Sequence, residues 1–191
     1  MTRRENQVRR RPPSRQPRTR VLVVCGGVRT ERDYMNGLKR RERNPAVQIK
    51  VVGKGLDPES LVRHAVEMRI HAPDDFDEIW CVTDVDQFDL QPAVRLAEAE
   101  GISLAVSNPC FELWLLYHHE DRRRPVRDAD EAIEALRRYV PHYAKNALRL
   151  EDYADTRAAI DRGRSSHDGV RSPGPNPSSG VWRLAELVIA G

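Results

Sequence analysis

The sequence predicts an α/β fold in which a parallel sheet of about four strands carries helices on both faces. Apolar runs of strand length alternate with segments of helical periodicity from residue 21 to residue 108. This alternation is typical of parallel sheets built from strand, helix and strand units. The first apolar run, VLVVCGG, contains no polar side chain, as expected of a central strand that is covered on both faces.

The first strand is expected at Val21–Gly27, and its two closing glycines indicate a tight turn. Thr30 is expected to cap a helix over Glu31–Arg43, which stops where Pro45 follows. Strands and helices then continue to alternate. Further strands are expected at Val47–Gly53, Glu78–Asp86 and Ile102–Asn108. The helices between them are expected from Asp57 and Pro58 to about His71 and at Gln91–Glu100.

After Asn108 the alternation ends and the remaining pattern is helical. Helices are expected at Phe111–His119, Ala129–Tyr139, about Ala147–Asp161 and Val181–Ala190, with a loop rich in Gly, Ser and Pro at Gly163–Gly180. We therefore expect three parts in the chain. These are a disordered basic arm over residues 1–20, the α/β domain over residues 21–120, and a helical extension over residues 121–191 that packs on the same domain.

The amino-terminal segment is strongly basic. Residues 1–20 hold eight arginines and one glutamate, whereas the whole chain has a net charge of only +3. With almost no apolar residues, this segment cannot offset the entropy lost on ordering. Its arginines, including Arg9, Arg10 and Arg11, are expected to bind nucleic-acid phosphates through counterion release. The alternative interpretation is a solubilising tail.

The composition also bears on the cellular location of the protein and on the state of its cysteines. No apolar run approaches the roughly 20 residues that cross a membrane, and the amino terminus is charged where a signal peptide is apolar. We therefore expect a cytoplasmic protein without membrane contacts. Cys25, Cys81 and Cys110 lack the paired spacing of a zinc site and are expected to be buried thiols.

Polar residues gather where the predicted strands end, the edge at which parallel sheets bind ligands. Asp84 and Asp86 close the third strand two residues apart, so both carboxylates are expected on one side of it, about 7 Å apart at Cα. Such oxygen ligands suit Mg²⁺ or Mn²⁺, which would hold phosphate oxygens and activate a nucleophile. The other candidates at this edge are Glu31, Lys54, Asn108 and Glu112.

The two aspartates, Glu31 and Asn108 also have purely structural interpretations. Aspartates are common at strand ends, where they start turns and cap helices. Glu31 could instead complement the dipole of its own helix, and Asn108 could cap the helix that follows.

Several strings of the sequence resemble the RloB-like family. They are CGGVRTERDYM, DPESLVRHA, TDVDQF, the long string SNPCFELWLLYH, and NPSS before the last helix. The resemblance implies a Toprim-like fold, a place in phage defence through restriction or abortive infection, and Mg²⁺-dependent action on nucleic acid. It also implies a site in which a glutamate after the first strand is the general acid or base and Asp84 and Asp86 hold metal.

One position departs from the family pattern. The family usually has Cys-Glu-Gly where this chain has Cys25, Gly26 and Gly27. Because glycine cannot transfer a proton, either Glu31 or Glu112 takes the catalytic role beside Asp84, or the chemistry is reduced.

Three functions remain in view. The first is a metal-dependent nuclease or another phosphodiester-cleaving enzyme. The second is a nucleic-acid-binding or partner-binding subunit of a defence system that has lost catalysis. The third, a haloacid-dehalogenase-like phosphatase, is disfavoured because its nucleophilic aspartate usually lies on the first strand.

Overall fold

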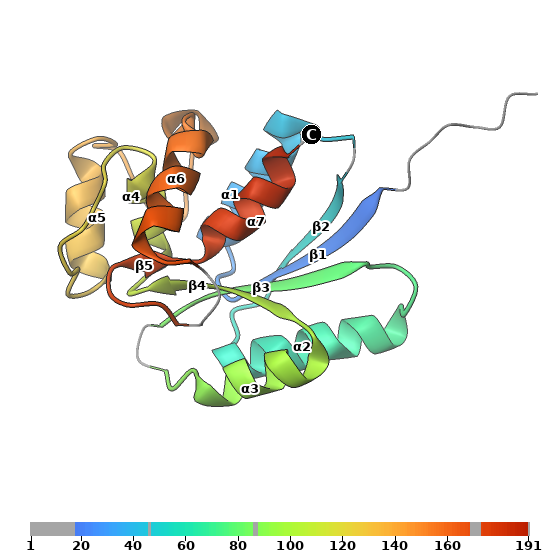
Figure 1. Cartoon of the computed structure of the whole chain (residues 1–191). Helices are drawn as coiled ribbons and strands as arrows, with labels where there is room; N and C mark the ends of the chain where they lie inside the picture. Colours follow the sequence, from blue (N-terminus) through green and yellow to red (C-terminus); the bar gives the residue numbers. More distant parts are fainter. Residues whose placement is uncertain (1–17, 46, 86–87, 169–172, 191) are drawn as a thin grey trace, which may run out of the picture.

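Within residues 18–45, 47–85, 88–168 and 173–190, which the computed structural model describes, five strands form one sheet in the order β2-β1-β3-β4-β5 (Figure 1). The strands are Thr19–Cys25 (β1), Val47–Gly53 (β2), Glu78–Asp84 (β3), Ser103–Asn108 (β4) and Ser178–Ser179 (β5). The first four pair in parallel, and β5 pairs antiparallel to β4. The predicted α/β class is therefore confirmed, and the layout fits a Toprim-like sheet with one short added strand.

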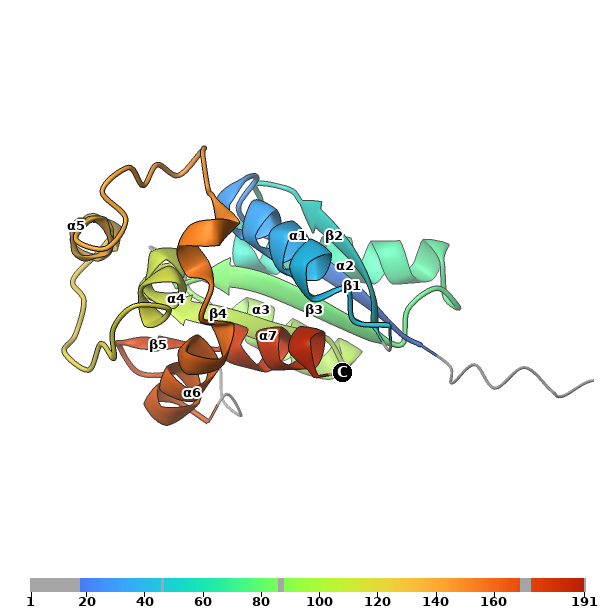
Figure 2. The same cartoon turned by 90° about the horizontal axis from the view of Figure 1, so that it is seen from above.

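Helices cover both faces of this sheet. They are Thr30–Glu42 (α1), Pro58–His71 (α2), Gln91–Glu100 (α3), Phe111–Tyr117 (α4), Ala129–Arg137 (α5), Thr156–Ser166 (α6) and Val181–Ile189 (α7), with a 3-10 turn at Leu150–Tyr153 (η1). Helices α2 and α3 lie on one face, and α1 and α7 lie on the other with α4 to α6 (Figure 1). Seen from above, α1 and α7 run side by side over the sheet, and α5 lies beyond α4 at one end (Figure 2).

The central strand β1 shows why the sheet is buried on both sides. Val21, Val23 and Cys25 belong to the core beneath α1, α4 and α7, whereas Leu22 and Val24 belong to the core beneath α2 and α3. Because successive side chains of a strand point to opposite faces, a run without polar residues supplies both cores.

The starts of α1 and α2 differ in how well the local sequence predicts them. Helix α2 begins at Pro58, where a helix start was predicted, and Asp57 caps it by accepting a hydrogen bond from the Ser60 amide at 3.0 Å. Thr30 is not the cap of α1, contrary to prediction. It is the first residue of that helix, and its hydroxyl donates to the carbonyl of Lys145 at 2.6 Å.

The carboxyl-terminal extension departs most from the predicted elements. The helix expected from Ala147 is wrong in its start, because Asp155 accepts a hydrogen bond from the Ala158 amide at 3.0 Å and begins α6 there. Helix α6 continues into the expected loop through Gly163, where a Cβ would lie 2.9 Å from the Cβ of Trp182 on α7. Glycine thus permits close packing of α6 against α7.

Strand β5 has no counterpart among the predicted elements. Its two serines pair with Ser107 and Asn108, and they carry no apolar alternation that would indicate a strand. The expectation that strands stop after Asn108 is therefore wrong.

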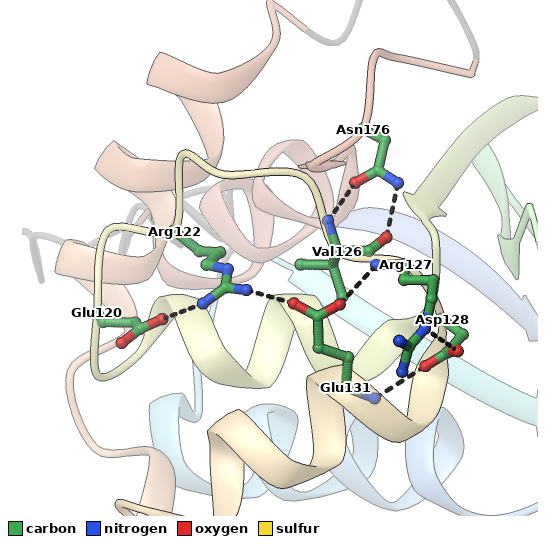
Figure 3. Close-up of polar contacts among 7 residues, drawn as sticks. All are labelled: Glu120, Arg122, Val126, Arg127, Asp128, Glu131 and Asn176. Atoms are coloured by element: carbon green, nitrogen blue, oxygen red, sulfur yellow. Dashed lines mark hydrogen bonds and ion pairs between the residues drawn. The ribbon is translucent and has the colours of Figure 1, made fainter.

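A polar network ties the segment between α4 and α5 to the residues before β5 (Figure 3). The side chain of Asn176 accepts from the Val126 amide at 2.9 Å and donates to the Val126 carbonyl at 2.7 Å. Arg122 reaches Glu131 at 2.6 Å and Glu120 at 3.7 Å. These contacts fix the segment between α4 and α5 relative to the residues that lead into β5.

The start of β1 lies inside the segment expected to be a disordered arm. Arg20 belongs to β1 and forms an ion pair with Asp77 at 2.8 Å. Residues 1–17, which include Arg9, Arg10 and Arg11, lie outside the described part of the chain.

The three cysteines are buried free thiols, as predicted. Among the helices of the described residues, none combines the length and apolar character needed to cross a bilayer.

Candidate functional site

A cavity of about 300 Å³ opens at the carboxyl ends of β1 and β3. It is lined by Gly27, Val28, Arg29, Thr30, Glu31, Asp84, Phe111, Glu112, Lys145 and Asn146. These residues come from the turn after β1, the starts of α1 and α4, the end of β3, and the segment between α5 and η1. The cavity therefore lies at the sheet edge where ligand binding is expected.

Three acidic side chains from three different elements line this cavity. Glu31 is the second residue of α1, Asp84 is the last residue of β3, and Glu112 is the second residue of α4. Gly27 makes room for the first of them, because a Cβ at that position would lie 1.8 Å from Oε2 of Glu31. A side chain at position 27 would push the Glu31 carboxylate away from the end of the strand.

Burial makes ionisation of two of these acids unfavourable. Glu31 is only 8% exposed, and burial raises its pKa above the ordinary value, with a further rise from the charge of Glu112. Burial also raises the pKa of Asp84 well above its usual range, and the charges of Glu31 and Glu112 add to that effect. Oδ1 of Asp84 is buried and has no hydrogen-bond partner among the described residues.

Glu112 is held differently from the other two acids. It is 3% exposed, and its Oε1 accepts a hydrogen bond from the Tyr143 hydroxyl at 2.9 Å. The ammonium of Lys145 lies 3.5 Å from the same oxygen. Burial acts to lower the pKa of Lys145, but the combined effects of Glu112, Cys110 and Asp84 outweigh it, so this pKa is raised overall. Glu112 is thus a fixed carboxylate with two donors directed at one of its oxygens.

Three residues at or beside the cavity were not predicted from the sequence, namely Tyr143, Lys145 and Asn146. They follow α5 in a segment without regular structure, and no strand end or motif singles them out. The hydrogen bond from Thr30 to the Lys145 carbonyl fastens this segment beside the start of α1. Only the folded chain brings these residues to the cavity.

Two predicted site residues lie elsewhere. The amide of Asn108 donates to the Gly174 carbonyl at 2.9 Å, so this side chain braces the segment before β5 and does not line the cavity. Lys54 is exposed after β2 and is not among the cavity residues either. Asp86 lies outside the described residues.

The three carboxylates of the cavity are of the chemical type that binds a hard divalent cation. Carboxylate oxygens are the ligands that Mg²⁺ and Mn²⁺ prefer, and a buried carboxylate oxygen without a partner is a natural ligand. However, across the described ranges no three His, Cys, Asp or Glu side chains are gathered closely enough to hold a metal ion. Glu31, Asp84 and Glu112 therefore share a cavity without forming a complete set of metal ligands.

Neither the curated proteins nor the solved structures include a match to this chain. A family model described as RloB-like protein matches residues 21–188, which include every element from β2 to β5 and all residues of the cavity. With the match covering most of the sequence, the chain belongs to the RloB-like family.

Proposed function

We propose that this RloB-like protein is a metal-dependent phosphodiester-cleaving enzyme that acts on nucleic acid. The observation that supports it most is the cavity lined by Glu31, Asp84 and Glu112, in which an oxygen of Asp84 is buried without a partner among the described residues. Like charges in such a space are unfavourable unless a cation or a proton offsets them. A bound divalent cation would offset these negative charges and would also act as the catalytic metal.

Asp84 would hold Mg²⁺ or Mn²⁺ together with Asp86. Such an ion, when bound, polarises a phosphate oxygen and lowers the pKa of a coordinated water. Among the other two acids, Glu31 is better suited to proton transfer. Its pKa is raised toward neutrality, where general acid–base catalysis is most effective. Glu112 is engaged by Tyr143 and Lys145 and is better suited to anchor the site.

The nucleic-acid substrate and the role in phage defence are proposals that rest on two further features. The resemblance to the RloB-like family implies both. The arginines of residues 1–20 offer a sequence-independent attraction to phosphates that would add affinity without specificity.

One observation favours a second candidate, a binding subunit without catalysis. Position 26, where the family usually has glutamate, is a glycine whose amide donates to the Val82 carbonyl at 2.8 Å. If neither Glu31 nor Glu112 replaces the missing acid, the fold and the basic arm would still support binding.

A cleavage assay separates the two candidates. The full chain is incubated with single- and double-stranded DNA and RNA in Mg²⁺, in Mn²⁺ and in a chelator. We expect metal-dependent cleavage that Asp84→Asn abolishes and that Glu31→Gln slows by roughly 10²- to 10⁴-fold. Asp161→Asn is the matched control, since Asp161 is an exposed aspartate on α6 with a 76% exposed side chain. Binding of nucleic acid without cleavage in either metal would favour the second candidate.

A further inference from the structure

Among the described residues, two cations line the acidic cavity, Arg29 and Lys145, and Lys145 is the one that contacts a carboxylate there. Its side chain is 55% exposed, whereas that of its partner Glu112 is 4% exposed. The ammonium thus lies between a buried acid and the solvent. A molecule that enters the cavity would meet the ammonium on the side away from Glu112.

The ammonium of Lys145 retains hydrogen-bonding capacity. It has three donors, and its ion-pair partner, Oε1 of Glu112, lies at 3.5 Å, which is long for a hydrogen bond. The same oxygen already accepts the shorter bond from Tyr143 at 2.9 Å. Glu112 therefore does not require Lys145 as a hydrogen-bond donor, and two of the three donors can serve another acceptor.

The backbone of Lys145 is held in place while its side chain extends toward solvent. The carbonyl of Lys145 accepts from Thr30 at 2.6 Å, and Tyr143, two residues earlier, is 4% exposed and bonded to Glu112. Lys145 also offsets the charge of the buried Glu112, but its own side chain is 55% exposed and so stays accessible to a ligand. A fixed backbone with an available ammonium is what a substrate-binding lysine needs.

We infer that Lys145 binds a phosphate oxygen of the substrate beside the three carboxylates. The inference deepens the proposed function, because it names the cation that receives an anionic substrate in a cavity lined by acids. The ligand is a phosphate group, either within a phosphodiester or as a terminal phosphate. The ammonium would offset the charge of one nonbridging oxygen of that phosphate.

The test compares Lys145→Met with the parent by isothermal titration calorimetry of the full chain. The probes are inorganic phosphate and a thymidine dinucleotide, each with and without Ca²⁺, and Mn²⁺ alone. We expect affinity for at least one phosphate probe to fall on the order of 10- to 100-fold, the loss typical of a hydrogen bond to a charged group. The probe whose affinity falls identifies the phosphate source. Lys145→Arg should retain most of the affinity.

The Mn²⁺ titration keeps this inference separate from the metal site. Lys145→Met should bind Mn²⁺ at least as tightly as the parent, because a positive charge next to the carboxylates is removed. Lys50→Met is the matched control, since the Lys50 ammonium lies over the Phe76 ring and not at the cavity. Unchanged affinity for both phosphate probes, or no phosphate binding by the parent, would overturn the role of Lys145. Absence of Mn²⁺ binding by the parent would overturn the metal proposal alone.

Discussion

Replacing Asp84 by asparagine should stabilise the metal-free protein while removing its affinity for metal. Oδ1 of Asp84 is buried without a partner among the described residues, and Glu31 and Glu112 line the same cavity. Removing the charge relieves a buried carboxylate that has one oxygen without a partner among the described residues, an effect of about 1–3 kcal/mol in the free energy of unfolding. For a domain of this size the melting temperature should rise by roughly 3–10 °C at neutral pH.

The stability gain should depend on pH in a defined direction. Because the folded-state pKa of Asp84 is raised above its ordinary value of 3.8, the folded protein binds the proton more tightly than the unfolded chain does. The parent therefore loses stability as pH rises above 3.8 until the folded-state pKa is passed. Asp84→Asn avoids that loss, so its advantage should be largest near pH 8 and absent near pH 3. Thermal unfolding in a chelator across this range measures it.

Metal should reverse the order of stability. A divalent cation at about 1,000 times its dissociation constant would stabilise the parent by about 4.1 kcal/mol and leave Asp84→Asn unchanged, which exceeds the advantage of the variant. The control Asp161→Asn should stay within about 0.5 kcal/mol of the parent in both conditions. An Asp84→Asn variant that is less stable than the parent at pH 8 in the chelator would refute this reasoning, and so would an advantage that does not change with pH. Either result would mean that ionisation of Asp84 does not destabilise the metal-free protein.

Three further outcomes are expected. Gly26→Glu should fold, because a Cβ at position 26 would meet its nearest neighbours at 3.4 Å or more. It should not raise activity, because Gly26 does not line the cavity and a Cβ there would lie nearest the Val82 carbonyl, at 3.4 Å; a tenfold gain would contradict this. Asn176→Ala should lower the free energy of unfolding in urea by about 1–2 kcal/mol, since both hydrogen bonds to the Val126 backbone disappear; an unchanged value would mean that water replaces them. Deleting residues 2–17 should flatten the salt dependence of duplex DNA binding by about 0.9 for each phosphate that this arm neutralises. An unchanged slope would leave the arm as a solubilising tail.

The candidate site was only partly predictable from the sequence. Asp84, Glu31 and Glu112 could be named in advance because each lies where a strand ends or the next helix begins, and the ends of parallel strands meet at one edge. Asn108 meets the same description, but its side chain bonds to the Gly174 carbonyl. Position at a strand end restricts where a side chain can lie without deciding which partner it contacts.

The sequence by itself determined the α/β class, the bounds of β2 and α3, and the start of α2. These features follow from local causes, namely apolar runs, helical spacing and a capping aspartate before proline. Tertiary structure alone decided the pairing of β5 with β4, and it alone brought Tyr143 and Lys145 to Glu112. Contacts between residues some 30 or 70 positions apart depend on how α4 to α7 pack over the sheet, and no local pattern in the chain specifies that packing.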